Sequence, residues 1–249
     1  LPISPLRMPA NVLLAPTINV LRHPQWGRAQ ETYGEDTVHV GAMGVAFIQG
    51  AQEHVLASAK HFAANSIEDT RFEVDVTIGE RALREVYLPH FRRAVVDGGV
   101  GSVMSAYNFV NGDHASESTH LLRDILKGEW GFEGFVESDW VFGTRSTVGG
   151  ALGGLDIEMP SAVYFGQALV DAVRNGEVPE EVVDEAALRI VGRKVAFADR
   201  MENAVEPDAV ETAEHVALAR EVAVASLVLL KNEGGALPLS LEPGATLVV

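Results

Sequence analysis

The amino-acid sequence predicts an α/β fold built around a parallel sheet. Strand-like and helix-like segments alternate along the chain, and the connections between them are short, which is typical of parallel strands joined by crossover helices. Five such units run in one direction, which favours a (β/α)8 barrel of the TIM type over a doubly wound sheet. No Gly-x-Gly-x-x-Gly motif follows the first strand, and this weakens the alternative of a dinucleotide-binding fold.

The first part of the chain supplies two of these units. Residues 11–20 (NVLLAPTINV) are expected to form a buried strand and the loop that leaves it. Small and apolar side chains at helical spacing predict a helix over residues 37–52. Residues 54–63 (HVLASAKHFA) are the second strand, and residues 79–99 form a strongly amphipathic helix that a Gly-Gly pair ends.

The alternation continues to residue 201. Residues 100–108 (VGSVMSAYN) are the third expected strand, and residues 116–131 form a capped helix. A short apolar run at residues 135–136 is the fourth strand, and residues 151–160 (ALGGLDIEMP) are the fifth. Two further helices are expected over residues 165–175 and 180–201.

The composition changes after residue 201. Residues 202–215 are acidic and contain proline, which indicates a linker running into a helix, and an apolar run, a turn and a second apolar run follow. We therefore predict a barrel domain over residues 1–201 and the start of a second domain over residues 202–249. Because the sequence enters a strand without an initiator methionine and stops inside an apolar run, we expect both domains to be incomplete.

Composition argues against several classes of function. The 249 residues carry a formal net charge of −16, whereas nucleic-acid or anionic-membrane binding needs clustered Lys and Arg. There are no cysteines, which excludes thiolate metal sites, and the histidines lack metal-binding spacing. The chemistry considered below needs neither a metal nor a cofactor. No apolar run reaches the ~18 residues of a transmembrane helix, and no secretory signal is visible. A cytoplasmic or a secreted location stays open, and so does a homo-oligomer.

Polar and aromatic residues follow every expected strand. In strand order they are Arg28, Lys60 with His61, Met104 with Tyr107, Asp139 with Trp140, and Asp156 with Glu158. Because the carboxyl ends of barrel strands meet at one face, these side chains predict a single pocket. Charged groups that bind vicinal hydroxyls and aromatic faces that cover a sugar ring suit a carbohydrate.

Asp139 is the expected nucleophile of a retaining glycosidase. In that chemistry one carboxylate attacks the anomeric carbon, and a second carboxyl group ~5–5.5 Å away protonates the leaving oxygen. The cations of Lys60 and Arg28 would keep Asp139 ionised at neutral pH. Asp156 and Glu158 are expected to fix loops at the barrel rim and not to act as the acid.

Seven segments occur in a fixed order along the chain. They are NVLLAPTINVLRHPQWGRAQETYGED, KHFAAN, ERALREVYLPHFRRAV, SVMSAYNFVNG, LLRDILKGEWGFEGFVESDW, GLDIEMP and SLVLLKNEGGALPL. Together they resemble glycoside hydrolase family 3, in its β-glucosidase branch, over nearly the whole chain from Asn11. The resemblance implies a TIM-type barrel, incomplete at its N-terminus, followed by a linker and the start of an α/β sandwich domain. It also implies release of terminal β-D-glucosyl residues from a small glucoside or oligosaccharide, with retention of configuration.

The resemblance implies roles for four polar residues. Asp139, in the SDW motif, matches the family's nucleophile. Lys60 and His61 match the adjacent pair that binds hydroxyls of the glycone, and Arg28, in WGR, matches the arginine that does the same. The structural alternatives are a helix cap for Asp139, an ion-paired Lys60, a core His61, and a salt bridge from Arg28 to a nearby glutamate.

Three further residues resemble parts of the sugar site. Tyr107 is similar to the tyrosine close to the nucleophile, and Met104 lies on the same strand end. Trp140 is similar to the aromatic residue that borders the −1 and +1 subsites. Ordinary packing is the alternative for all three, above all for Met104, since methionine is most often a core residue.

Two pieces of the family pattern are missing from the sequence. The family has an earlier barrel segment whose Asp binds distal hydroxyls, and nothing before Asn11 corresponds to it. Its acid/base is a Glu on the second domain, which we expect to lie outside this chain. The stretch KHFAANSIEDTR replaces the hexosaminidase motif KHFPGHG, which favours a β-glucosidase, or a related exo-glycosidase such as a β-xylosidase. A truncated barrel that only binds sugar is the non-catalytic alternative.

Overall fold

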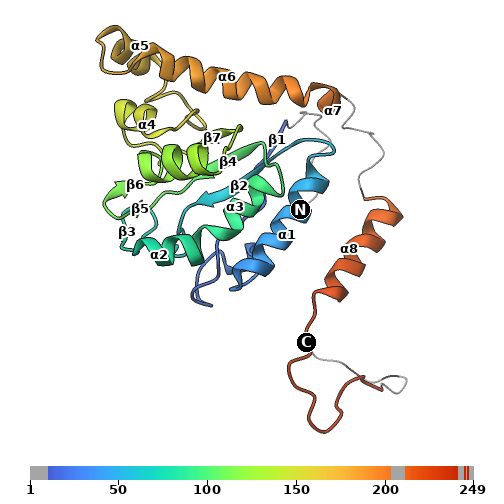
Figure 1. The fold of residues 1–249 in the computed structure, drawn as a ribbon. Coiled ribbons are helices and arrows are strands. Elements are labelled where there is room, and N and C mark those ends of the chain that lie inside the picture. Colours follow the sequence, from blue (N-terminus) through green and yellow to red (C-terminus); the bar gives the residue numbers. More distant parts are fainter. Residues whose placement is uncertain (1–10, 203–210, 241–243, 245, 247–249) are drawn as a thin grey trace. The chain divides into compact units, whose positions relative to one another are not determined.

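A parallel four-stranded sheet carries the candidate site in the computed structural model, which describes residues 11–202, 211–240, 244 and 246. The strands lie in the order β1-β2-β4-β7 (Figure 1). They are Val12–Leu13 (β1), Leu56–Phe62 (β2), Ser102–Ser105 (β4) and Phe135–Glu137 (β7). Single parallel bridges, Thr17 to Lys60 and Glu137 to Ile157, extend the pairing. The predicted α/β fold with a parallel sheet is therefore confirmed, whereas the sheet formed by the described residues is open and not a closed barrel.

The chain divides into two compact units, Leu1–Ala204 and Val205–Val249. The second unit contains one helix, α8 (Ala213–Ala225), in its described part, and residues 226–240 form no strand. The sequence predicts a strand there, but a strand needs a neighbouring backbone to pair with, and the described residues of this unit provide none. The expected linker falls largely on residues 203–210, outside the described residues, and the two-domain division at residue 201 stays a prediction.

Helices connect the strands of the first unit. They are α1 (Thr37–Ala51), α3 (Pro89–Val96), the π-helical η3 (His120–Glu129), α4 (Thr147–Gly153), α5 (Gln167–Arg174), α6 (Glu180–Ala196) and α7 (Ala198–Glu202). Asp36 caps α1, because its Oδ1 accepts the N–H of His39 at 2.7 Å. Gly41 lets α1 approach α3 closely, since a Cβ there would lie 3.0 Å from the Arg93 side chain.

Several predicted elements differ in extent: β1 is shorter than the expected segment 11–20, and the helix expected over residues 180–201 is divided into α6 and α7. Two further elements differ for a clear local reason. The single helix expected over residues 79–99 is three pieces, α2 (Glu80–Ala82), a π-helical turn η2 (Leu83–Tyr87) and α3, because Pro89 has no N–H to continue the helix. The fifth strand expected over residues 151–160 begins as the end of α4. Gly154, with a φ of 110°, ends that helix, and only Ile157 then pairs with β7.

A small second sheet was not predicted. Its strands are β3 (Asp75–Val76), β5 (Phe109–Val110) and β6 (Asp113–His114). Strands of two residues carry no hydrophobic period that a sequence could reveal. The sheet joins the loop after β2 to the loop after β4, so it holds together two of the segments that surround the candidate site.

The core lies between the parallel sheet and the helices. β2 is buried along almost its whole length, as expected for a central parallel strand that is covered on both faces. Phe62 is fully buried and makes edge contacts with Phe91 and Trp130, at centroid distances of 5.2 and 5.9 Å. Among the described helices, none has the length and apolar character needed to cross a membrane.

Candidate active site

The predicted site residues gather at the carboxyl ends of the parallel strands. Lys60 and His61 are near the end of β2, Tyr107 lies two residues after β4, and Asp139 lies two residues after β7. Arg28 precedes the short 3-10 turn η1 (Ala29–Glu31) in the long loop after β1. Because β2, β4 and β7 are parallel neighbours, these ends lie on one edge of the sheet.

Asp139 is a buried carboxylate with one hydrogen-bonded oxygen and one unpaired oxygen. It is 7% exposed, and its Oδ1 accepts the N–H of Trp140 at 2.7 Å. Its Oδ2 has no hydrogen-bond partner among the described residues. Burial raises the pKa of Asp139, while the Trp140 N–H, the Tyr107 hydroxyl and the cations of Arg28 and Lys60 act to lower it. A carboxylate oxygen without a partner can act as a nucleophile when the group is ionised.

Arg28 joins the loop after β1 to the end of β2. Its Nε and Nη2 donate to the two carboxylate oxygens of Glu31, each at 2.7 Å, and its Nη1 lies 2.8 Å from Nε2 of His61. Burial acts to lower the pKa of Arg28, but the hydrogen bond and charge of Glu31 raise it overall. The salt bridge that was the structural alternative for Arg28 is therefore present, and it orients the guanidinium toward His61.

His61 is fixed by Asn19 from the loop after β1. Its main-chain N–H donates to Asn19 Oδ1 at 2.8 Å, and its carbonyl accepts from Asn19 Nδ2 at 2.8 Å. Its ring Nδ1 lies 3.2 Å from the same Oδ1. Burial, followed by the charges of Arg28 and Lys60, holds the pKa of His61 well below its usual range. The 3.6 Å approach of its Nε2 to Asp139 Oδ2 is thus a contact with an uncharged ring and not an ion pair.

Lys60 faces the same carboxylate from the neighbouring strand position. Its ammonium makes no hydrogen bond to any described residue, and burial together with the charge of Arg28 lowers its pKa. The negative charges of Glu31, Asp139 and Glu137 oppose that shift. Its three N–H donors are therefore free for hydroxyl groups of a ligand.

Tyr107 lies beside Asp139, and its hydroxyl is already engaged. Its hydroxyl donates to the main-chain oxygen of Trp140 at 2.8 Å, and burial and the Asp139 charge raise its pKa. Its ring contacts Phe72 at 4.7 Å and carries the guanidinium of Arg71 at 5.0 Å from its centroid. The tyrosine thus links the turn of Asp139 and Trp140 to the loop after β2.

Met104 and Trp140 stay predictions. Met104 is 2% exposed and sits opposite Glu137 in the β4–β7 pairing, so its side chain is part of the buried sheet. Trp140 is half-buried, and its described role is through its main chain, which contacts Asp139 and Tyr107.

Four residues around the site were missed by the sequence reasoning. Arg71 and Phe72 reach Tyr107 from the loop after β2, Asn19 holds His61, and Glu137 accepts a hydrogen bond from Ser58 inside the sheet. Burial raises the pKa of Glu137. Arg71 had a signal, since it follows Lys60 by eleven positions in the same loop, whereas Asn19 and Glu137 had none.

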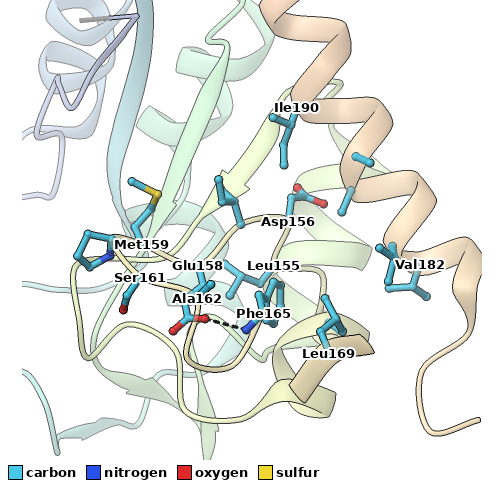
Figure 2. Close-up of a pocket in the computed structure, with 16 residues that line it drawn as sticks. Leu155, Asp156, Glu158, Met159, Ser161, Ala162, Phe165, Leu169, Val182 and Ile190 are labelled. Atoms are coloured by element: carbon cyan, nitrogen blue, oxygen red, sulfur yellow. Dashed lines mark hydrogen bonds between the residues drawn. The ribbon is translucent and has the colours of Figure 1, made fainter. Parts of the chain in front are cut away.

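Asp156 and Glu158 are structural, as expected. Asp156 pairs with Lys127 at 2.7 Å and accepts the N–H of Val136, with both charged groups almost fully buried. Glu158 accepts the main-chain N–H groups of residues 163–165, and Figure 2 shows the bond from Phe165. Neither carboxylate is free to act as an acid.

A cavity beside α6 is separate from this site. It measures about 440 Å³ and lies between α6 and the segment from Leu155 to Phe165, with Val182 and Ile190 among its apolar walls (Figure 2). Its lining includes none of the strand-end cations, so it does not suit a sugar. Among the described residues, no group of three or more His, Asp or Glu side chains could hold a metal ion.

Comparisons with known proteins give a consistent picture. The family model for the glycosyl hydrolase family 3 N terminal domain matches residues 6–192. Beta-glucosidase B of Emericella nidulans is 44% identical over 238 residues, which cover 94% of this chain and 28% of that protein. A beta-glucosidase of Rhizobium radiobacter is 44% identical over 235 residues, again 28% of its length. The chain therefore spans less than a third of these curated relatives.

Solved structures of beta-glucosidases are similar to this chain over a comparable share of its length. The family 3 beta-glucosidase of Bifidobacterium adolescentis superimposes with a TM-score of 0.86 at 35% identity, over 92% of this chain and 34% of that one. Beta-glucosidase 3B of Thermotoga neapolitana, in complex with alpha-D-glucose, gives 0.84 at 39% identity, over 93% and 33%. The beta-glucosidase of Kluyveromyces marxianus, in complex with glucose, gives 0.87 at 38% identity, over 93% and 29%.

Proposed function

This chain belongs to glycosyl hydrolase family 3, and we propose that it is the nucleophile-bearing region of a retaining β-glucosidase. The observation that carries the proposal is the unpaired oxygen of Asp139, which lies at the strand ends among the cations of Arg28 and Lys60. Two solved relatives in complex with glucose, and a curated relative named as a beta-glucosidase, support a sugar as the ligand.

In the proposed reaction Asp139 Oδ2 attacks the anomeric carbon of a terminal β-glucosyl residue. The bond from the anomeric carbon to the leaving oxygen breaks as the new ester bond to Asp139 forms. Water later cleaves this ester, and the released sugar has the same anomeric configuration as the substrate. Asp139 is suited to this step because Oδ1 is held by the Trp140 N–H, so the other oxygen alone faces the ligand. No metal or cofactor takes part.

The neighbouring side chains bind the sugar in this proposal. The free N–H donors of Lys60, and the N–H groups of Arg28 that Glu31 does not bind, donate to vicinal hydroxyl groups of the sugar. His61 holds Arg28 in place. Tyr107 and Trp140 border the position of the ring, and Met104 contributes a buried wall. These contacts would tighten as the ring flattens toward an oxocarbenium-like transition state.

The acid that protonates the leaving oxygen is proposed to be a Glu of the α/β sandwich domain, as the family resemblance implies. Two carboxyl groups that influence Lys60 are already engaged, since Glu31 binds Arg28 and Glu137 binds Ser58. We also propose that residues 1–201 are part of a closed TIM-type barrel and that residues 202–249 lead into the sandwich domain.

Covalent trapping tests the proposal. An activated 2-deoxy-2-fluoro-β-glucoside has a good leaving group that needs little acid assistance, so labelling measures the nucleophile and the sugar pocket alone. We expect a mass gain of one fluoroglucosyl group, located on Asp139 by peptide mapping and absent from Asp139→Asn. The matched control is Asp97→Asn, an exposed carboxylate paired with Arg93, which should label normally.

Three results would contradict the proposal. A label on any residue other than Asp139 would remove the nucleophile assignment. A folded chain that stays unlabelled by the glucoside but reacts with the corresponding xyloside would point to a β-xylosidase, and glucose binding without either reaction would point to a region that only binds sugar.

A further inference from the structure

Asn19 is hydrogen-bonded to both the main chain and the ring of His61. Three hydrogen-bond distances join the two residues, one to the main-chain N–H of His61, one to its carbonyl and one to its ring. Asn19 is 2% exposed and His61 is 1% exposed, so water cannot replace these contacts.

The orientation of the Asn19 amide follows from the main chain of His61. A main-chain N–H can only donate and a carbonyl can only accept, so Oδ1 must face the N–H and Nδ2 must face the carbonyl. The same Oδ1 lies 3.2 Å from ring atom Nδ1. Because an amide oxygen only accepts, Nδ1 carries the ring proton.

The contact of Arg28 with the other ring nitrogen of His61 indicates the same tautomer. Its Nη1 lies 2.8 Å from Nε2 of His61, and a guanidinium N–H can only donate. Nε2 must therefore be the bare, accepting nitrogen. The two contacts, made by residues that do not hydrogen-bond to each other, agree on an uncharged imidazole with its proton on Nδ1.

This choice of tautomer decides the state of the nucleophile. Nε2 is 3.6 Å from Asp139 Oδ2, and two bare acceptors form no hydrogen bond. A proton on Nε2 would occupy the direction in which Nε2 now accepts from Arg28, so it would displace that contact and place a donor 3.6 Å from Asp139 Oδ2. The open state of Oδ2 thus depends on where the His61 proton lies.

The charges that face His61 favour the uncharged ring. The cations are Arg28, Lys60 and Arg71, each of which lowers the pKa of His61, and burial lowers it most. Asp139 is the one carboxylate in contact with the ring among the described residues. Asn19 is uncharged, so it fixes the position of the proton without favouring the charged imidazolium.

We propose that Asn19 is a positioning residue that holds His61 in its Nδ1-protonated tautomer and thereby keeps Asp139 Oδ2 unpaired for attack. The proposal rests on the function proposed above for its role in turnover, although the tautomer itself can be measured without any reaction.

Nitrogen NMR of the ring tests the first half of the proposal. The chain, labelled with ¹⁵N in its eight histidines, is examined by long-range ¹H–¹⁵N correlation between pH 5 and pH 8, and the His61 signals are those lost in His61→Gln. We expect a protonated Nδ1 and a bare Nε2 throughout. An Nε2-protonated ring, which is the form free histidine prefers, or an imidazolium at pH 6, would overturn the proposal whether or not the chain is a glucosidase.

Asn19→Ala tests the second half, with Asn65→Ala as the matched control. Asn65 is also almost fully buried, but neither of its amide atoms has a partner among the described residues. We expect Asn19→Ala to show a second His61 tautomer and to slow fluoroglucoside labelling about a hundredfold, and Asn65→Ala to keep the wild-type tautomer. A single unchanged tautomer with labelling within about threefold of wild type would overturn the role of Asn19. If the variant does not fold, the wild-type spectrum alone decides.

Discussion

Replacing His90 should remove a measurable part of the acid sensitivity of the first unit. His90 lies in α3, is 1% exposed, and packs against Phe91 with a ring separation of 4.8 Å. Its Nδ1 has no hydrogen-bond partner among the described residues, and burial lowers its pKa from 6.5 to about 3. The folded chain therefore holds an uncharged imidazole that the unfolded chain would protonate in weak acid.

The magnitude follows from this difference in proton binding. Between pH 6.5 and pH 3 the unfolded chain binds a proton at His90 that the folded chain does not, so the free energy of unfolding falls as the pH decreases. Between pH 7.5 and pH 5 only the part below pH 6.5, about 1.5 pH units, contributes. At about 1.36 kcal/mol per pH unit, the free energy of unfolding falls by about 2 kcal/mol. At pH 5 this loss of stability depends little on the pKa of His90 in the folded chain, provided that this pKa is well below 5.

Denaturant unfolding of His90→Leu at the two pH values measures this contribution. All three tryptophans lie in the first unit, so their fluorescence follows its unfolding. Between pH 7.5 and pH 5 we expect wild type to lose about 2 kcal/mol more stability than His90→Leu. Phe91→Leu is the matched control, since it alters the same buried region but removes no titrating group. Equal losses in wild type and His90→Leu would refute a buried, uncharged His90.

Three other substitutions have defined outcomes. Lys127→Met should lower the free energy of unfolding by ~3–5 kcal/mol, because it leaves a buried carboxylate without its cation at 2.7 Å; a loss below ~1 kcal/mol would contradict a buried ion pair. Gly143→Ala should abolish labelling of Asp139, because the added Cβ would lie 2.3 to 2.8 Å from that residue's main chain, whereas Gly50→Ala, with open space around it, should label normally. Lys60→Ala should slow turnover of the active enzyme by about a hundredfold or more, and a change below about tenfold, or ~1.4 kcal/mol, would indicate a structural lysine.

Much of the candidate site could be predicted because parallel strands bring their ends together. Lys60, His61 and Asp139 follow apolar runs, so a strand assignment alone places them on one edge of the sheet. Arg28 was predicted by its motif, and the structure shows why it points inward, since Glu31 holds two of its nitrogens. Each of these residues has a polar side chain at or after the end of a buried segment, and this pattern can be recognised in the sequence.

The supporting contacts could not be predicted in the same way. Asn19 and His61 are separated by 42 positions, and nothing in either segment indicates that one amide would bind both the main chain and the ring of the other. Element boundaries failed where one residue overrides the hydrophobic period. Pro89 interrupts a continuous amphipathic pattern, and Gly154 converts an apolar run that looks like a strand into the end of a helix.

The bond between Asp139 Oδ1 and the N–H of the next residue has a consequence for how the site meets a substrate. A free carboxylate turns about its Cβ–Cγ bond, and its two oxygens exchange places within nanoseconds. In this chain that rotation would break a 2.7 Å hydrogen bond inside a buried turn, so the two oxygens keep separate identities. The rotational entropy of the side chain is lost when the chain folds and not when a sugar binds. In the proposed reaction the sugar therefore meets one oxygen that is already oriented, and the main-chain hydrogen bond of the turn determines which of the two oxygens attacks.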